Sequence, residues 1–330
     1  KHVGANCVLV LPKMEAITPV SSDDGSAAST NGPDMYSIRK CVEMYDAAMI
    51  PVAPVLGAIL DAFKPSFLYE SDLFKGQLAA EENGKERSQF IDIGCGTGSF
   101  TLKYLRPLMP SWCTRLVAVD KSETMLQFAR EHCSDPTIDY RPLDLLVDDS
   151  VAEFVQEQGR FQRVYSFMLL HWVADQLHAL KNIATLMTPG GECFVVFSRI
   201  LPAHRVFMEV KSSPQWSKYA HLLEDVIPET VLMEDTALMR TYTVKLVHDA
   251  GLTALACEVF RVSAHGGLSN ASAGDLFTLM NPIYEKLNDE EKEELRKFTH
   301  RALEDDRKKI AGSARNIRDM VVIHAFKEQK

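Results

Sequence analysis

The sequence predicts an α/β fold: a doubly wound, mostly parallel seven-stranded sheet with an N-terminal helical cap and helical insertions after the sheet. From residue 89, short apolar runs alternate with amphipathic stretches, which is typical of parallel strands joined by crossover helices. The first run, 89–93, leads directly into a glycine-rich turn at 94–98. Acidic residues follow successive strands, at the sheet edge where open α/β folds bind ligands. Together these features predict a ligand-binding domain.

The composition is that of an ordinary globular protein. The 330 residues are 46% hydrophobic and 25% charged, enough for one large domain with additions or for two domains. The net charge of −9 gives no electrostatic reason to bind nucleic acid or an anionic membrane, so a small-molecule partner is expected. No apolar run approaches the ~20 residues of a membrane span, and no secretory leader is evident, which predicts a cytoplasmic protein. Seven scattered cysteines without a C-x-x-C pair predict reduced thiols, with no metal site.

The first 88 residues are expected to form two parts. Residues 1–34 are rich in serine, glycine, proline and other small polar residues, so we expect disorder. Residues 35–88 are expected to form a helical cap and a polar connector, with prolines dividing the cap into short helices. Because the chain begins with Lys1, its start is expected to be incomplete or processed, with Met14 and Met35 as candidate starts.

Residues 89–330 are expected to form the ligand-binding domain. Strands are predicted where β-branched and aromatic residues run together, and helices where apolar residues recur on one face. The predicted strands are 89–93, 115–120, 138–143, 161–168, 193–197, 255–262 and 320–326. The predicted crossover helices are 100–108, 122–132, 150–158 and 174–187. Later helices, 203–219, 222–226, 234–249, 272–282 and 289–309, form two insertions, about 203–250 and 271–311, which we expect on the substrate side.

The glycine turn has the features of a cofactor cradle. Glycines 94, 96 and 98 allow positive φ and remove the Cβ, so the backbone can turn sharply and approach a ligand. The helix behind the turn directs unpaired N–H groups toward it. The nicotinamide fingerprint G-x-G-x-x-G needs its third glycine one residue later, and Asp92 would repel a pyrophosphate but suits a cation. The alternative is a glycine-rich turn without a ligand.

Asp-x-Gly-x-Gly-x-Gly after a strand resembles motif I of class I S-adenosylmethionine-dependent methyltransferases. The resemblance implies their Rossmann-like fold for 89–330 and S-adenosylmethionine as the cofactor. A carboxylate at Asp120 can accept both ribose hydroxyls, and Asp144 is placed to accept from the adenine amino group beside Leu145. Any one of these aspartates alone could instead be a turn or helix-cap residue. The candidate cofactor-binding residues are Asp92, Gly94, Cys95, Gly96, Gly98, Asp120, Lys121, Asp144, Leu145 and Ser166.

The segment Ser-Phe-x-x-Leu-His-Trp-Val at 166–173 resembles the same stretch of arthropod juvenile hormone acid methyltransferases. The resemblance implies carboxyl O-methylation of a small lipophilic acid of the farnesoic or juvenile hormone acid type. It also implies that Trp172 holds the substrate carboxylate, since an indole N–H donates to carboxylate oxygens. That family has a second carboxylate ligand, a glutamine in the N-terminal helix, and no glutamine occurs between Lys1 and Ser71.

Two alternative functions remain open at this point. One is a methyltransferase acting on a hydroxyl or amine, with His171 as the general base because a histidine pKa lies near neutrality. The other is a cofactor-binding protein without transfer activity, which the absent glutamine motivates. Trp172 could also be a buried aromatic residue that only packs, and His171 a structural histidine. The sequence contains no indication of oligomeric state.

Overall fold

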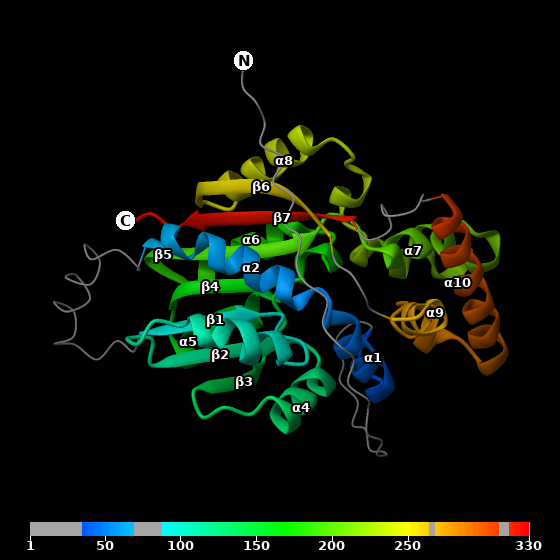
Figure 1. Cartoon of the computed structure of the whole chain (residues 1–330), viewed down its shortest axis with the longest axis horizontal. Helices are drawn as coiled ribbons and strands as arrows, with labels where there is room; N and C mark the ends of the chain where they lie inside the picture. The colour runs from blue at the N-terminus through cyan, green and yellow to red at the C-terminus, as the bar shows by residue number, and fades with distance from the viewer. Residues whose placement is uncertain (1–34, 69–87, 264–267, 310–316, 330) are drawn as a thin grey trace.

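The computed structural model describes residues 35–68, 88–263, 268–309 and 317–329 (Figure 1). The disorder expected for 1–34 and most of the expected connector lie outside the described residues. Within them, seven strands form one sheet in the order β3-β2-β1-β4-β5-β7-β6. The strands are β1 Gln89–Ile93, β2 Arg115–Asp120, β3 Ile138–Pro142, β4 Phe161–Phe167, β5 Met187–Ser198, β6 Thr253–Ser263 and β7 Ile317–Phe326.

The sheet is mostly parallel, as the alternation of strands and helices predicts. Strands β1 to β5 pair in parallel, and β7 runs antiparallel to both β5 and β6. The chain order reverses at β1 and β4, so a crevice opens there beyond the carboxyl ends of the strands. Strand β5 begins six residues before the predicted Cys193, at Met187. The Pro-Gly-Gly stretch extends the strand because Gly190 and Gly191 exchange backbone hydrogen bonds with Lys327, both 2.8 Å.

Helices cover both faces of the sheet, as a doubly wound fold requires. One face carries α5 Asp148–Gln158, α6 Gln176–Leu186 and α8 Thr236–Asp249. The other carries α2 Ala53–Phe63, α4 Glu123–His132 and the helical segment after the glycine turn. That segment was predicted as one helix, 100–108. It is a π-helical turn, η3 Thr101–Leu105, followed by the 3-10 turn η4 Arg106–Leu108, in which Pro107 lacks the N–H that an α-helix needs.

A group of helices packs together beyond the carboxyl ends of the strands (Figure 1). Its members are α1 Arg39–Met49, α7 Pro202–Ser212, the 3-10 segment η6 Pro214–Val226, α9 Asn270–Leu279 and α10 Asp289–Lys309. The bounds of α10 are as predicted. The predicted helix 203–219 is broken at Pro214, whose ring cannot continue an α-helix. The expected grouping of 203–250 also differs, because α8 packs on β6 and α6 in the sheet layer.

Short 3-10 turns complete the described elements: η1 Lys64–Ser66, η5 Leu170–Trp172, η7 Glu229–Leu232 and η8 Tyr284–Lys286.

No single helix in the described ranges has the length and apolar composition to cross a membrane. The bent pair of α1 and 53–66, with 57° between them, passes that test together, by length and composition only.

A buried ionic cluster ties the N-terminal cap to the sheet. Arg163 on β4 pairs with Glu192 on β5 at 2.7 Å, and both side chains are almost completely buried. The second carboxylate oxygen of Glu192 accepts from His324 Nε2 at 2.9 Å and from the backbone N–H of Leu68 at 3.0 Å. Because Leu68 follows α2 and η1, this bond fixes the cap against the sheet and so helps to place α1 at the carboxyl edge.

Candidate active site

The glycine turn adopts the positive φ values that its sequence predicts. Gly94, Gly96 and Gly98 have φ values of 74°, 55° and 73°. A Cβ at Gly98 would lie 2.6 Å from the hydroxyl oxygen of Tyr140, so a larger residue cannot fit there. The N–H groups of Gly94 and Cys95 both donate to the Val119 carbonyl, at 2.8 and 2.9 Å, which fixes the turn to the end of β2.

Asp92 lies buried beneath this turn, with one oxygen satisfied and one not. Its Oδ2 accepts a hydrogen bond from Thr101 Oγ1 at 2.6 Å, whereas Oδ1 is inaccessible and has no partner among the described residues. Burial raises the pKa of Asp92 to about 7, against the opposing effect of the Thr101 hydrogen bond. A buried carboxylate oxygen without a partner is costly, and a positively charged ligand would satisfy it.

Asp120, at the end of β2, is held in a fixed orientation by the backbone. Its Oδ2 accepts from the Gly96 N–H at 3.0 Å and its Oδ1 from the Ser122 N–H at 2.9 Å. These two bonds hold the carboxylate at the end of β2, beside the glycine turn, and a carboxylate is an acceptor for hydroxyl donors. The geometry is compatible with the predicted role of Asp120 toward a ribose.

Asp144 also has a local role. Its Oδ1 accepts from the Leu146 N–H at 3.0 Å, which closes the turn after β3. Leu145 is buried in the core on the face that carries α5 and α6. The turn role that the sequence left as an alternative for Asp144 is therefore present, and its predicted contact with adenine stays a prediction.

Three further residues that the sequence predicts at the cofactor, Cys95, Lys121 and Ser166, lie in different surroundings. Cys95 is buried, and burial raises the pKa of its thiol well above the usual value, as befits a small packing residue. Lys121 is exposed. The Ser166 hydroxyl donates to the Ile93 carbonyl at 3.0 Å and so ties β4 to β1. Their predicted cofactor contacts remain predictions.

Helix α1 contributes two residues that the sequence did not single out for this site. Asp46 Oδ1 accepts hydrogen bonds from the hydroxyls of Thr97 and Ser99, both at 2.7 Å. The ring of Tyr45 lies 3.6 Å from the point where a Cβ on Gly96 would stand. Burial, and then the charge of Asp120, raise the pKa of Tyr45. Only the folded chain shows these contacts, because some 50 residues separate α1 from the turn.

A cavity of about 120 Å³ lies between the N-terminal cap and the glycine turn. Helices α1 and α2 form one side of it, and Gly94, Cys95, Thr97 and Phe167 contribute to the other. This cavity is adjacent to the predicted cofactor residues, and α1 forms part of its wall.

Trp172 and His171 lie in η5, immediately after β4, where the sequence predicts the acceptor. Trp172 is 9% exposed and packs within the helical group, with its ring 4.8 Å from that of His204 and 6.1 Å from that of Phe207. His171 is buried, and its Nδ1 has no partner in the described part of the chain. Burial, with smaller effects of His204 and Arg318, lowers the pKa of His171 well below its usual value. The prediction of a near-neutral pKa is therefore wrong.

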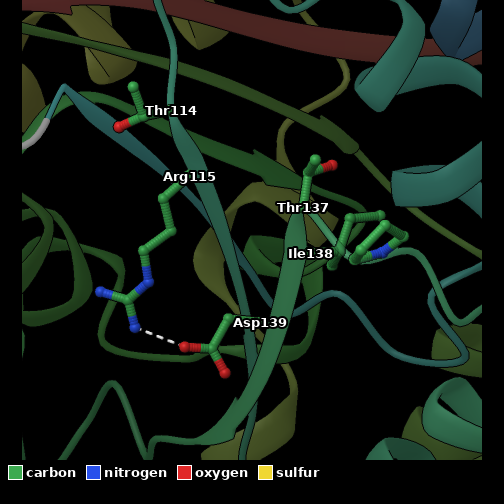
Figure 2. Close-up of a pocket in the computed structure, with 6 residues that line it drawn as sticks. Thr114, Arg115, Thr137, Ile138 and Asp139 are labelled. Atoms are coloured by element: carbon green, nitrogen blue, oxygen red, sulfur yellow. Dashed lines mark hydrogen bonds and ion pairs between the residues drawn. The ribbon is translucent and has the colours of Figure 1, made fainter.

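A second hollow, of about 640 Å³, lies at the opposite edge of the sheet, near the starts of β2 and β3 (Figure 2). Figure 2 shows the Arg115 guanidinium directed at the carboxylate of Asp139, with which it forms an ion pair. Arg115 also donates to Gln158 at 2.7 Å and to Gln89 at 3.1 Å. Because its charged groups already have partners and it is remote from the glycine turn, we do not assign a ligand to this hollow.

Comparison with known proteins identifies the domain that contains the turn. Residues 90–191 match a family model described as a methyltransferase domain. This stretch, which contains the glycine turn, is therefore similar to methyltransferase domains. The chain is 28% identical over 199 residues to juvenile hormone acid O-methyltransferase of Drosophila melanogaster, a match that covers 60% of this chain and 58% of that protein. The Bombyx mori protein of the same name is 35% identical over 129 residues, covering 39% and 45%. The chain thus spans about half the length of these relatives.

A solved S-adenosylmethionine-dependent methyltransferase from Anabaena variabilis aligns with 84% of this chain and 95% of its own, at 14% identity and a TM-score of 0.42. Together with the Asp-x-Gly-x-Gly-x-Gly turn, the match of residues 90–191 to a methyltransferase domain supports the predicted cofactor, S-adenosyl-L-methionine. The residues present fit this cofactor: the Asp92 oxygen without a partner among the described residues suits a positive charge, and the backbone orients the Asp120 carboxylate, a hydroxyl acceptor, beside the glycine turn. Within the described ranges, no three His, Cys, Asp or Glu side chains are grouped to hold a metal ion.

Proposed function

We propose that the protein O-methylates the carboxylate of a small lipophilic acid, of the farnesoic or juvenile hormone acid type. The observation that carries the proposal is the position of Trp172, directly after β4 and within the apolar core of the helical group. An indole N–H can donate to a carboxylate oxygen while the ring forms an apolar wall. The partial identity with the two insect juvenile hormone acid O-methyltransferases supports the same substrate class.

The cofactor would be held by the residues around the glycine turn. We propose that Asp92 faces its positive charge, that Asp120 accepts from the ribose hydroxyls, and that Asp144 with Leu145 binds adenine. When bound, the cofactor supplies an electrophilic methyl group. We further propose that 89–330 functions as the methyltransferase domain and that 35–88 is its cap, since Tyr45 and Asp46 contact the turn.

Carboxylate methylation suits the chemistry of the site because it requires no general base. A carboxylic acid with a pKa near ~4 is already ionised at neutral pH. Alignment of the reacting atoms and exclusion of water would then supply most of the rate acceleration. The low pKa of the buried His171 makes this side chain a weak base at neutral pH. It would therefore deprotonate a hydroxyl acceptor poorly.

Cofactor binding followed by an acceptor screen tests the proposal. Calorimetry with S-adenosylmethionine establishes binding, and transfer of a labelled methyl group is then measured on fatty and isoprenoid acids of graded length. Alcohols and amines with the same carbon skeletons serve as matched acceptors. We expect methyl esters and no methyl ethers or methylamines. Methylation confined to alcohols or amines would overturn the carboxylate assignment, and binding without turnover on any acceptor would indicate a protein without transfer activity.

A further inference from the structure

Arg318 lies at the same edge of the sheet as Trp172. It is the second residue of β7, which runs antiparallel to β5, and Met320 pairs with the last residue of β5, Ser198. Arg318 therefore stands just beyond the carboxyl end of β5. Strand residues two apart share a face, so Arg318 lies on the face of Met320 and Val322, which form the core beneath α2.

The guanidinium of Arg318 has no counter-charge in the described part of the chain. Its Nε is inaccessible to solvent and has no hydrogen-bond partner there, and burial lowers the pKa of Arg318. The adjacent Asp319 lies on the other face and already binds Arg199 at 3.2 Å and Arg261 at 3.1 Å. Arg318 as a whole is half-buried, and a partly desolvated guanidinium without a counter-charge is stabilised when an anion joins it.

Arg163 shows how the same chain accommodates a buried arginine for structural purposes. Its guanidinium meets Glu192 at 2.7 Å and Tyr165 Oη at 3.1 Å, and it stacks over the ring of Phe67 at 4.3 Å. Arg318 has no comparable set of partners among the described residues. Unlike the fully buried Arg163, the half-buried Arg318 is therefore available to an anionic ligand.

The neighbours of Arg318 are suited to an organic anion. Its charge acts on His171, which is buried and neutral and has an unpartnered Nδ1. The ring of His171 lies 5.0 Å from that of the adjacent Trp172. Both residues follow β4, which pairs with β5, and Arg318 lies on β7 just beyond the end of β5, so all three are at the same edge of the sheet. His204 Nδ1 accepts from the Leu201 N–H at 3.1 Å, which orients that ring beside Trp172. This neighbourhood combines a guanidinium, an indole N–H and aromatic surface.

We propose that Arg318 binds the carboxylate of the acceptor. The assignment rests on the proposed function and adds the residue that selects acids over neutral analogues. Arg318 pairs with the carboxylate group while Trp172 contacts it from η5, and it fills the role of the glutamine that the cap lacks. On methylation, the carboxylate oxygen gains the methyl group as the carbon–sulfur bond of the sulfonium breaks, which leaves a neutral ester and a neutral thioether. The ester no longer attracts the guanidinium, which favours its release.

Direct binding measurements test the role of Arg318 separately from catalysis. The full chain and the variants Arg318→Met and Arg318→Gln are titrated calorimetrically with farnesoic acid, methyl farnesoate and farnesol. We expect both variants to bind the acid at least 30-fold more weakly, with less than threefold change for the ester and the alcohol. Arg261→Met is the matched control, because Arg261 lies on the neighbouring strand and faces the other side. It should leave all three affinities unchanged.

Thermal unfolding and cofactor titration verify that the variants are folded. Both neutral variants should retain cofactor affinity within twofold and a melting temperature close to that of the original chain, since each removes a half-buried charge that has no counter-charge among the described residues. Acid binding that is unchanged in a folded variant would overturn the assignment of Arg318. If the original chain binds the cofactor but methylates only alcohols or amines, the proposed function itself fails. If it esterifies acids and the variants do so with unchanged KM, only the Arg318 assignment fails.

Discussion

The carboxylate of Asp46, on α1, accepts a hydrogen bond from the hydroxyl of Thr97 in the glycine turn, at 2.7 Å. With the second bond from Ser99, this contact holds α1 against the turn. The adjoining cavity measures about 120 Å³, whereas pockets for organic ligands generally measure roughly 300–1,000 Å³. Because α1 forms part of the cavity wall, we expect cofactor entry to require movement of α1.

Replacement of Asp46 by alanine should speed cofactor entry. Hydrogen bonds to a charged acceptor contribute about 1.5–3 kcal/mol, so their loss lowers the free energy needed to move α1. Stopped-flow fluorescence should show an association rate for S-adenosylmethionine at least ~5-fold higher in Asp46→Ala. Asp61→Ala is the control, since Asp61 is an exposed residue of α2. An unchanged rate in Asp46→Ala would show that α1 does not limit entry.

The raised pKa of Asp92 predicts how the stability of the cofactor-free protein depends on pH. The pKa is about 7 in the folded chain and 3.8 ordinarily, so between these values the folded chain retains a proton that the unfolded chain has lost. Stability should therefore fall as pH rises through this window, by on the order of 4 kcal/mol at full titration. Urea unfolding of Asp92→Asn should lack this loss, leaving it the more stable protein at pH 8. If the free energy of unfolding depends on pH in the same way for the two proteins, the raised pKa assigned to Asp92 is refuted.

Cofactor affinity should show the opposite pH dependence. Ionised Asp92 attracts a cationic ligand, so the affinity of the original chain for S-adenosylmethionine should increase as pH rises toward and past 7. Asp92→Asn should bind roughly 10- to 100-fold more weakly at pH 8, because a charge-assisted interaction is lost. Calorimetry at several pH values measures both effects. Equal affinity of the two proteins at pH 8 would exclude a contact between Asp92 and the charged cofactor.

The Arg163–Glu192 pair should contribute strongly to stability. Glu192→Gln leaves Arg163 buried without its counter-charge and should lower the free energy of unfolding by about 3–5 kcal/mol at neutral pH. The exposed pair of Arg240 and Glu258 provides a control, since Glu258→Gln should cost at most about 1 kcal/mol. Urea denaturation of both variants measures the difference. If Glu192→Gln lowers the free energy of unfolding by less than Glu258→Gln does, this account of the buried cluster is contradicted.

The contribution of the Arg163–Glu192 pair to stability should depend on pH. Burial raises the pKa of Glu192, but the His324 hydrogen bond and the charge of Arg163 outweigh it, so the net pKa is lowered. A carboxyl with a lowered folded pKa stabilises the protein above its ordinary value of 4.5, and that contribution disappears as pH falls through the folded value. The stability difference between the original chain and Glu192→Gln should therefore shrink in acid. A difference that stays constant from neutral pH into acid would be inconsistent with this shift.

Trp172→Phe should separate the hydrogen bond of the indole from its apolar surface. Phenylalanine retains an aromatic wall and lacks the N–H, so KM for an acid acceptor should rise roughly 5- to 20-fold while cofactor affinity stays within a few-fold. Trp216→Phe is matched, because Trp216 is buried in the same helical group and its Nε1 has no partner among the described residues. Steady-state kinetics of both variants provides the measurement. Equal effects would mean that Trp172 only packs.

The sequence predicted the elements whose signals are local. Strand β1 and helix α10 have the predicted bounds, because a β-branched and aromatic run and an amphipathic charged pattern each depend on residues close in sequence. The positive φ values of the three glycines follow in the same way from the D-x-G-x-G-x-G spacing.

The parts that escaped prediction depend on contacts between distant segments. Asp46 meets Thr97 only after α1 has folded onto the sheet, and Arg318 lies beyond the carboxyl end of β5 only because β7 inserts beside β5. The pKa of His171 was misjudged because burial, which sets it, is a property of the folded chain. Pro214 was the one available local signal that the predicted helix 203–219 would break.

The most direct test of the central claim is a competition between two acceptors of identical carbon skeleton. The full chain is incubated with labelled S-adenosylmethionine and equal concentrations of farnesoic acid and farnesol, and the methylated products are separated by chromatography. The account predicts methyl farnesoate as the labelled product, with no labelled methyl ether of farnesol. Label in the ether, with none in the ester, would contradict it.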